Sequence, residues 1–192
     1  MLEYNEIKEG KVILYENEPY GVLTSHVFRK QQRKPVNQTK LKNLLTGRIA
    51  EVAFHVSEKV DEAEINSRAI KYLYKNKGEF WFCEENNPSK RFALKEEVVG
   101  ASGKFLKENM TADLLTFVLN ENTEPKIVSV RLPIKVDFKV TEAPPGIKGD
   151  TASGGGKPVT LETGAIITAP LFINAGDTVR VNTQTGEYTE RV

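Results

Sequence analysis

The chain has 192 residues, of which 39% are hydrophobic and 28% are charged, a balance typical of a globular protein and not of a disordered one. The formal net charge is +1, and the single cysteine, Cys83, excludes an internal disulfide. No apolar run approaches the roughly 20 residues of a membrane-spanning helix, and the acidic N-terminus lacks the features of a signal peptide. We therefore expect a cytoplasmic protein without a membrane partner, in which Cys83 is a buried thiol.

The first third of the chain predicts short strands joined by turns. Strands rich in apolar and β-branched residues are expected at 11–15, 19–27, 36–45 and 48–56, with turns at 16–18 and 46–47. Strands of this length, with frequent turns, are typical of a small β-barrel. The connection 28–36 then forms a long hairpin tip, and Pro35 resists extension of the strand ladder toward it.

This tip and the strand after it carry the strongest local charge in the chain. Seven cations and no carboxylate lie between residues 29 and 48, namely Arg29, Lys30, Arg33, Lys34, Lys40, Lys42 and Arg48. The run 29–34 consists of four of them with Gln31 and Gln32, so it cannot pack inside a protein. Phosphate is the natural partner of such a cluster. A solvated hairpin loop explains the same charges, and the charges alone do not separate the two interpretations.

A second group of strands follows. They are expected at 67–75, 79–83, 91–94, 114–120 and 127–132, with a loop containing Pro88 at 86–89. Residues 95–108 have some helical character, which Gly100 and Gly103 weaken. Five strands with a short helix between the third and the fourth follow the order of an OB-type barrel.

A third group begins where Pro133 interrupts a strand. Further strands are expected at 134–140, 165–169, 171–173, 178–181 and 187–192, and a loop rich in glycine and proline at 143–158. The fold class is thus all-β, with three consecutive small barrels. We place the domains at 1–65, 66–127 and 128–192.

No group of residues has the pattern of an active site. The glycine-rich segment 153–157 fails the phosphate-loop pattern, because Thr151 replaces its first glycine and Pro158 follows Lys157. The two histidines, His26 and His55, have no metal-ligand spacing with Cys83. We expect no catalytic residue, no cofactor and no metal site, and thus no enzyme. Tyr188 and Arg191 can stack on or bind RNA, and a plain surface pair is the alternative.

Several segments together resemble the bacterial translation elongation factor P family over essentially the whole chain. They are residues 39–47, 68–74, 141–150, 155–164, 170–173, 176–177 and 185–192. The resemblance implies an SH3-like (KOW-like) barrel followed by two OB folds, in an L-shaped, tRNA-like monomer. It implies binding to both ribosomal subunits between the peptidyl-tRNA and exit sites, and stimulation of peptide-bond formation at polyproline stalls.

The resemblance also implies which residues meet RNA. The tip loop would reach the end of peptidyl-site tRNA, and the third domain would lie near exit-site mRNA. The residues implied on that domain's RNA-facing side are Gly149, Asp150, Ser153, Gly154, Gly155, Tyr188 and Arg191. The seven cations between residues 29 and 48 suit contacts with backbone phosphates, which position a protein without reading sequence.

The tip departs from the family pattern. Many family members have Pro-Gly-Lys-Gly there, with the lysine modified in some lineages, and others have a glycosylated arginine. This tip has no glycine and is one residue longer, so Gln31 or Gln32 takes the tip position, depending on the side from which it is counted. We expect an unmodified tip in which a glutamine touches the tRNA; Lys30, Arg33 or Lys34 as a modified residue is the alternative. A paralogue that binds RNA or ribosomes without stall rescue is the competing function.

Overall fold

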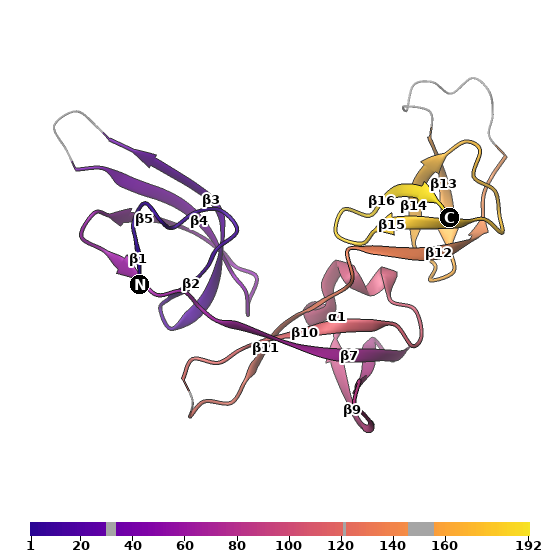
Figure 1. The fold of residues 1–192 in the computed structure, drawn as a ribbon, viewed down its shortest axis with the longest axis horizontal. Coiled ribbons are helices and arrows are strands. Elements are labelled where there is room, and N and C mark those ends of the chain that lie inside the picture. Colours follow the sequence, from indigo (N-terminus) through magenta and orange to yellow (C-terminus); the bar gives the residue numbers. More distant parts are fainter. Residues whose placement is uncertain (30–33, 121, 146–155) are drawn as a thin grey trace. The chain divides into compact units, whose positions relative to one another are not determined.

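The computed structural model describes residues 1–29, 34–120, 122–145 and 156–192 (Figure 1). In them the expected all-β class is confirmed, because the helical residues are confined to α1 (Glu96–Val99) and the 3-10 helix η1 (Gly100–Phe105). The chain divides into two compact units, Met1–Ser67 with Leu115–Ser129 and Arg68–Leu114 with Val130–Val192. The division into three domains and the L-shaped arrangement stay predictions.

The first unit is built on the antiparallel sheet β2-β3-β4-β5. Its strands are β2 (Val12–Tyr15), β3 (Glu18–Phe28), β4 (Val36–Asn43) and β5 (Ile49–His55), which confirm the four expected strands to within three residues. Two short strands that the sequence did not reveal, β1 (Leu2–Glu3) and β6 (Lys59–Val60), pair with each other. Ile7, Ile13 and Leu41 are fully buried in the core of this unit.

A second sheet has the order β11-β10-β7-β8-β9. Its strands are β7 (Ile65–Asn76), β8 (Glu79–Glu84), β9 (Asn87–Lys95), β10 (Thr111–Phe117) and β11 (Lys126–Arg131). Both α1 and η1 lie between β9 and β10, so the expected order of five strands and a helix is confirmed, and Cys83 is buried as expected. The loop expected at 86–89 is wrong, because β9 begins at Asn87. Pro88 is tolerated in this strand since β9 is at the edge of the sheet.

A third sheet has the order β14-β13-β12-β15-β16. Its strands are β12 (Lys135–Glu142), β13 (Gly156–Leu161), β14 (Ile166–Pro170), β15 (Thr178–Asn182) and β16 (Glu187–Arg191). The start of β13 lies inside the loop expected at 143–158, and the strand expected at 171–173 is wrong. A turn follows Pro170 instead, closed by the bond from the Ile173 N–H to the Pro170 oxygen (3.1 Å), which leaves Leu171 and Phe172 exposed.

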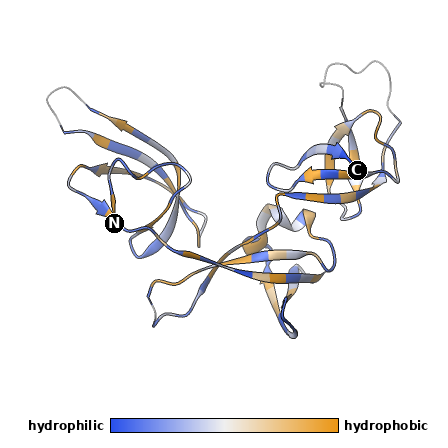
Figure 2. Cartoon of the chain, viewed as in Figure 1, coloured by the Kyte–Doolittle hydropathy of each residue, from blue (hydrophilic) through white to orange (hydrophobic). Residues whose placement is uncertain are grey.

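Most of the second sheet and the whole described third sheet belong to one unit and share one hydrophobic cluster. Hydrophobic and hydrophilic residues alternate along many of their strands (Figure 2), as expected of sheets with one buried face. Phe105, which ends η1, lies 5.9 Å from Phe138 of β12, measured between ring centroids. Both rings are almost completely buried. The Lys107 ammonium caps this contact by donating to the Asp137 carbonyl oxygen at 2.8 Å.

Arg180 links three neighbouring strands on the exposed face of the third sheet. Its Nε and Nη2 donate to the two carboxylate oxygens of Asp137, at 2.7 and 3.0 Å, and its Nη1 donates to Glu190 at 2.8 Å. The hydrogen bonds from Arg180, followed by its charge, lower the pKa of the Asp137 carboxyl group. The bidentate geometry fixes the register between β12 and β15.

This arrangement predicts a pH dependence of stability. Because the pKa of Asp137 is lowered by folding, its contribution is present above the pKa of the unfolded chain, about 4, and is lost as the pH falls through the folded pKa. We expect Arg180→Gln to be less stable than wild type near neutral pH and to converge with it as the pH falls through the folded pKa of Asp137. Urea unfolding, followed at several pH values by the fluorescence of Trp81, measures this. Arg91→Gln is the control, since Arg91 is exposed and has no ion pair among the described residues. Parallel curves for Arg180→Gln and wild type would contradict the prediction.

Candidate nucleic-acid interface

The hairpin β3–β4 carries the tip loop. Its two strands pair from Tyr20 and Asn43 at the base to Phe28 and Val36 at the far end, and their register shifts once, between Val22 and Thr24. The ladder ends at this far end, and Pro35 is the next residue from Val36 toward the tip, as expected of a residue that lacks an N–H. Arg29 and Lys34 are exposed at the ends of the two strands. The predicted tip residues between them, Lys30, Gln31, Gln32 and Arg33, lie outside the described residues.

Strand β4 separates its side chains cleanly between two faces. Gln38, Lys40 and Lys42 are exposed, while Asn37, Thr39, Leu41 and Asn43 are buried. The exposed side chains of β4 and its neighbours form what we call the outer face of this sheet. Its residues are Thr24, His26, Gln38, Lys40, Lys42, Ile49, Glu51, Ala53 and His55.

The charge of the outer face is mostly positive but not uniform. No ion pair between described residues involves Lys40, Lys42 or Arg48. Arg48 is exposed in the turn before β5, beside Ile49, which is opposite Lys42. The register also places Glu51 of β5 opposite Lys40, so the sheet brings in a carboxylate from beyond the cationic stretch. Of the predicted basic flank, Lys40 and Lys42 therefore lie together on the outer face with one acidic neighbour, and Arg48 lies in the adjoining turn.

Asn37 attaches the hairpin to the N-terminal segment. Its side chain is fully buried, and its Nδ2 donates to the carbonyl oxygens of Tyr4 and Ile7, at 2.6 and 2.9 Å. The Ser25 hydroxyl on the opposite strand donates to the same Ile7 oxygen at 2.7 Å and lies 3.1 Å from the Asn37 Oδ1. A buried amide with all its partners satisfied fixes the position of the strands that bear it.

Asn43 holds the other end of β4. Its Oδ1 accepts hydrogen bonds from the N–H groups of Leu45 and Thr46, both at 2.9 Å, and its Nδ2 donates to Glu18. The turn that follows ends at Gly47, whose φ of 74° is in the left-handed region that favours glycine. The turn predicted at 46–47 is thus confirmed, and Arg48 is positioned directly after it.

Sequence reasoning missed these buried polar residues of β4. Asn37 and Asn43 lie inside the strand expected at 36–45, but no role was predicted for them. The signal that could have found them is the period of two, because Asn37, Thr39 and Asn43 fall on the same side as Leu41. Polar residues at core positions require hydrogen-bond partners, and here the partners are loop carbonyls and turn amides.

The third sheet presents the other predicted contact residues. Tyr188 is half-buried against the hydrophobic cluster, opposite Val181, so only part of its ring faces solvent. Arg191 is exposed at the end of β16, and its guanidinium carbon lies 5.8 Å from the centroid of the exposed Phe172 ring. Its Nη1 is 4.0 Å from the Asp177 carboxylate. The structure thus adds Phe172, which sequence analysis had placed in a strand, to the surroundings of Arg191.

The predicted residues Gly149, Asp150, Ser153, Gly154 and Gly155 lie outside the described residues. A hydrogen bond connects the described segments before and after them. The side chain of Lys157 is buried, and its Nζ donates to the Pro144 carbonyl oxygen at 2.9 Å. Gly156 begins β13 so close to β14 that a Cβ atom there would lie 2.6 Å from the Thr168 methyl group. Both contacts fix the position of Gly156 and Lys157 at the start of β13.

The described residues contain no group of three or more His, Cys, Asp or Glu side chains arranged to hold a metal ion. None of their helices has the length and apolar character needed to cross a membrane.

The fold and the exposed basic hairpin together define an all-β protein of SH3- and OB-type barrels. A solved structure of eukaryotic translation initiation factor 5A from Methanococcus jannaschii is similar, with a TM-score of 0.50, 14% sequence identity and coverage of 67% of this chain and 92% of that one. At that identity the likeness shows the fold alone.

Two family models identify the family within this class. Residues 3–60 match the elongation factor P KOW-like domain, and residues 136–191 match the elongation factor P C-terminal domain. The elongation factor P of Carboxydothermus hydrogenoformans is 38% identical over 192 residues, and that of Thermotoga maritima is 41% identical over 191 residues, each with full coverage of both chains. The chain belongs to the elongation factor P family, as its sequence segments indicated. It is a translation factor.

Proposed function

We propose that this protein binds the ribosome between the peptidyl-tRNA and exit sites and stimulates peptide-bond formation at polyproline stalls. The observation that carries the proposal is the basic hairpin β3–β4 in a chain that belongs to this family. The hairpin is a long strand pair that leads to the tip loop, and the buried amide of Asn37 anchors it. Proline is a poor nucleophile in this step, and an element that holds the tRNA end in place lowers the entropic cost of alignment. The protein then acts without a catalytic residue or cofactor, and the ribosome performs the chemistry.

The proposal assigns roles to the residues already described. The tip residues Arg29 to Lys34 would contact the end of peptidyl-site tRNA, with Gln31 or Gln32 unmodified at the tip. Lys40, Lys42 and Arg48 would bind RNA phosphates, which suits exposed cations without ion pairs among the described residues. Tyr188, Arg191 and the segment 149–155 would face RNA of the small subunit, including exit-site mRNA. We further propose three domains, 1–65, 66–127 and 128–192, in a cytoplasmic monomer.

Synthesis of a triple-proline peptide tests the proposal. A reconstituted translation system without its own factor receives this protein, expressed without modifying enzymes. Rescue of the stall is the expected result, and it would also show that a tip without modification suffices. Protein purified from the native host, analysed by mass spectrometry, is the matched control for modification. A modified lysine or arginine in the tip, together with rescue by that material alone, would contradict the unmodified tip.

A divergent paralogue without rescue activity is the second candidate. The observation that favours it is the tip sequence, which lacks the glycines of many family members. Tight binding to 70S ribosomes without rescue by either preparation would establish this reading. Failure to bind ribosomes would reject both candidates.

The outer face predicts a measurable salt dependence. We expect Lys40→Gln with Lys42→Gln to weaken ribosome binding and to reduce the magnitude of the slope of log affinity against log salt by about 1.5. The reason is that each phosphate contact releases counterions on binding, and the double variant makes two contacts fewer. Binding at several salt concentrations and fixed magnesium measures it. Lys126→Gln with Lys135→Gln removes the same charge from exposed positions elsewhere and should change the slope less. Equal slopes for the two double variants would contradict the assignment.

A further inference from the structure

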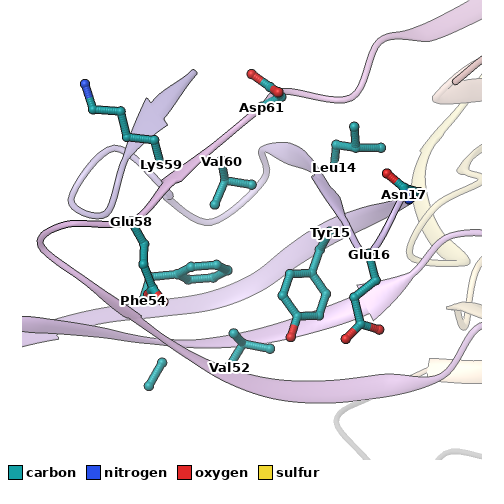
Figure 3. A pocket seen from close by; sticks show the side chains of 11 residues that line it. Leu14, Tyr15, Glu16, Asn17, Val52, Phe54, Glu58, Lys59, Val60 and Asp61 are labelled. Atoms are coloured by element: carbon teal, nitrogen blue, oxygen red, sulfur yellow. The ribbon is translucent and has the colours of Figure 1, made fainter. Parts of the chain in front are cut away.

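A pocket lies in the first unit, between the two edge strands of its four-stranded sheet. The sheet begins with β2 and ends with β5, and the described strands do not pair these two with each other. The pocket has a volume of about 580 Å³ and is lined by residues 14–17, 52–54 and 58–61 (Figure 3). This volume is within the range of about 300–1,000 Å³ that is common for ligand sites.

Aromatic rings form the apolar wall of the pocket. Tyr15 and Phe54 meet edge to face, with ring centroids 6.1 Å apart. Phe54 is buried and Tyr15 half-buried, so part of the Tyr15 ring remains open to a ligand. Burial, followed by the charge of Glu16, raises the pKa of the Tyr15 phenol, which therefore stays neutral at physiological pH and can donate a hydrogen bond. Faces of aromatic rings attract cations.

Two carboxylates that have no cationic partner among the described residues lie beside this wall. Figure 3 shows Glu58 on one side of the Tyr15 and Phe54 rings and Glu16 on the other. Neither takes part in an ion pair among the residues that the structure describes. The Glu58 Oε2 accepts the His55 backbone N–H at 2.6 Å, which fixes its position at the end of β5.

The other charged residues of the pocket are directed elsewhere. Lys59 lies 3.9 Å from Glu3, and Asp61 lies 3.6 Å from the terminal amino group of Met1. In Figure 3 both side chains extend away from the aromatic rings. The charge that faces the pocket interior is therefore negative, and a ligand with complementary charge is a cation.

Glu16 is held in an unfavourable backbone conformation. With Asn17 it forms the two-residue turn between β2 and β3, and both have positive φ angles, 51° and 62°. Such turns favour asparagine and glycine, and a glutamate there is disfavoured. The turn places the Glu16 carboxylate at the mouth of the pocket at a cost to stability. Backbone strain of this kind is common at ligand sites.

We propose that this pocket binds a lysine or arginine side chain from a basic peptide segment of a partner protein. The cation lies against the Tyr15 ring, between Glu16 and Glu58. A peptide is favoured over a free amine because β5 is an edge strand and offers backbone groups to an extended segment. The inference goes beyond the proposed ribosomal function and does not depend on it.

Titration of the ¹⁵N-labelled full chain with a defined peptide tests the proposal. The probe is a blocked six-residue peptide of threonine and valine with one central arginine, and its control has the neutral isostere citrulline in place of arginine. We expect amide shifts to be concentrated at residues 14–17, 52–54 and 58–60, and at least a tenfold lower affinity for the citrulline peptide. Glu16→Gln with Glu58→Gln should weaken binding of the arginine peptide about tenfold.

Glu51→Gln is the matched control variant. It removes a carboxylate from the same strand, β5, but on the exposed outer face, and should leave the affinity unchanged. Equal affinity for the arginine and citrulline peptides, or shifts outside the pocket, would overturn the proposal. Arginine amide that binds as tightly as the peptide would also overturn it, because the pocket would then accept a free cation without a peptide.

Discussion

Replacement of Asn37 by alanine is expected to destabilise the first unit by about 2–3 kcal/mol. The change removes both hydrogen bonds from the Asn37 amide and leaves the carbonyl oxygen of Tyr4 without this buried donor. It also takes away the Oδ1 that lies 3.1 Å from the Ser25 hydroxyl. Because the site is fully buried, water does not restore these partners without opening the structure. Amide hydrogen exchange over residues 4–7 and 24–39 measures the loss.

Two further variants make this prediction specific. Gln38→Ala changes the exposed neighbour in the same strand and should alter stability by less than about 0.5 kcal/mol. Asn37→Asp preserves the shape but replaces the donor with a carboxylate beside two carbonyl oxygens. Burial raises the pKa of such a carboxyl group, so this variant should recover stability as the pH falls and the group becomes a donor again. Equal protection in Asn37→Ala and Gln38→Ala would show that the amide does not anchor the hairpin.

The same variant connects the fold to the proposed function. In the proposed function the tip would act by position, and a small displacement of a positioning element can cost a large factor in rate. We therefore expect Asn37→Ala to reduce stall rescue even under conditions in which the chain remains folded. Ribosome affinity, to which we propose that Lys40 and Lys42 contribute by charge, should change less than rescue. A parallel loss of both would indicate unfolding of the unit instead of a displaced tip.

Local alternation was sufficient to predict most of the fold. The four strands β2 to β5 of the first unit and the chain order of the five strands of the second sheet follow from apolar residues at every second position, separated by turn residues. The errors occur where that rule competes with proline. Residues 171–173 are apolar but follow Pro170 in a turn, whereas Gly156 and Pro158 resemble a loop but lie in β13.

The position of Pro158 has a physical explanation that the sequence does not contain. The part of β13 that pairs with β12 includes Thr160 and Leu161, so the absent N–H of Pro158 lies outside this ladder. Gly156 is required by the close approach of Thr168, which only the register of β13 and β14 reveals. Contacts of this kind join residues that are distant in sequence, and a single sequence contains no direct record of them.

In the candidate site, too, the features set by local sequence could be predicted, and those set by contacts distant in sequence could not. Its cations could be predicted because charge density is a local property. The buried amide of Asn37 could not, because its partners lie 30 and 33 residues away along the chain. The acidic neighbour Glu51 was missed for the same reason, since only the strand register places it opposite Lys40.

In the second unit, Phe138→Ala is expected to cost about 3–5 kcal/mol, because a fully buried ring is replaced by a cavity. The substitution removes the contact of Phe138 with Phe105. It also removes the cation–π contact of the Lys107 ammonium, which lies 5.5 Å from the Phe138 ring centroid. Trp81, the only tryptophan, is in β8 of the same unit, so its fluorescence during urea unfolding reports the effect. Because the second and third sheets share this core, we expect the Trp81 transition to shift although the substitution is in β12.

Phe172→Ala is the matched control for this prediction, since Phe172 is 57% exposed and the same ring is lost from the surface of the same unit. Its cost should be below about 1 kcal/mol, most of it from the contact with Arg191. A Phe138→Ala protein whose Trp81 transition matches wild type, while the third sheet unfolds earlier by hydrogen exchange, would show that the two sheets unfold independently. A common shift would show that the contact between Phe105 and Phe138 couples the second and third sheets, so that they unfold together.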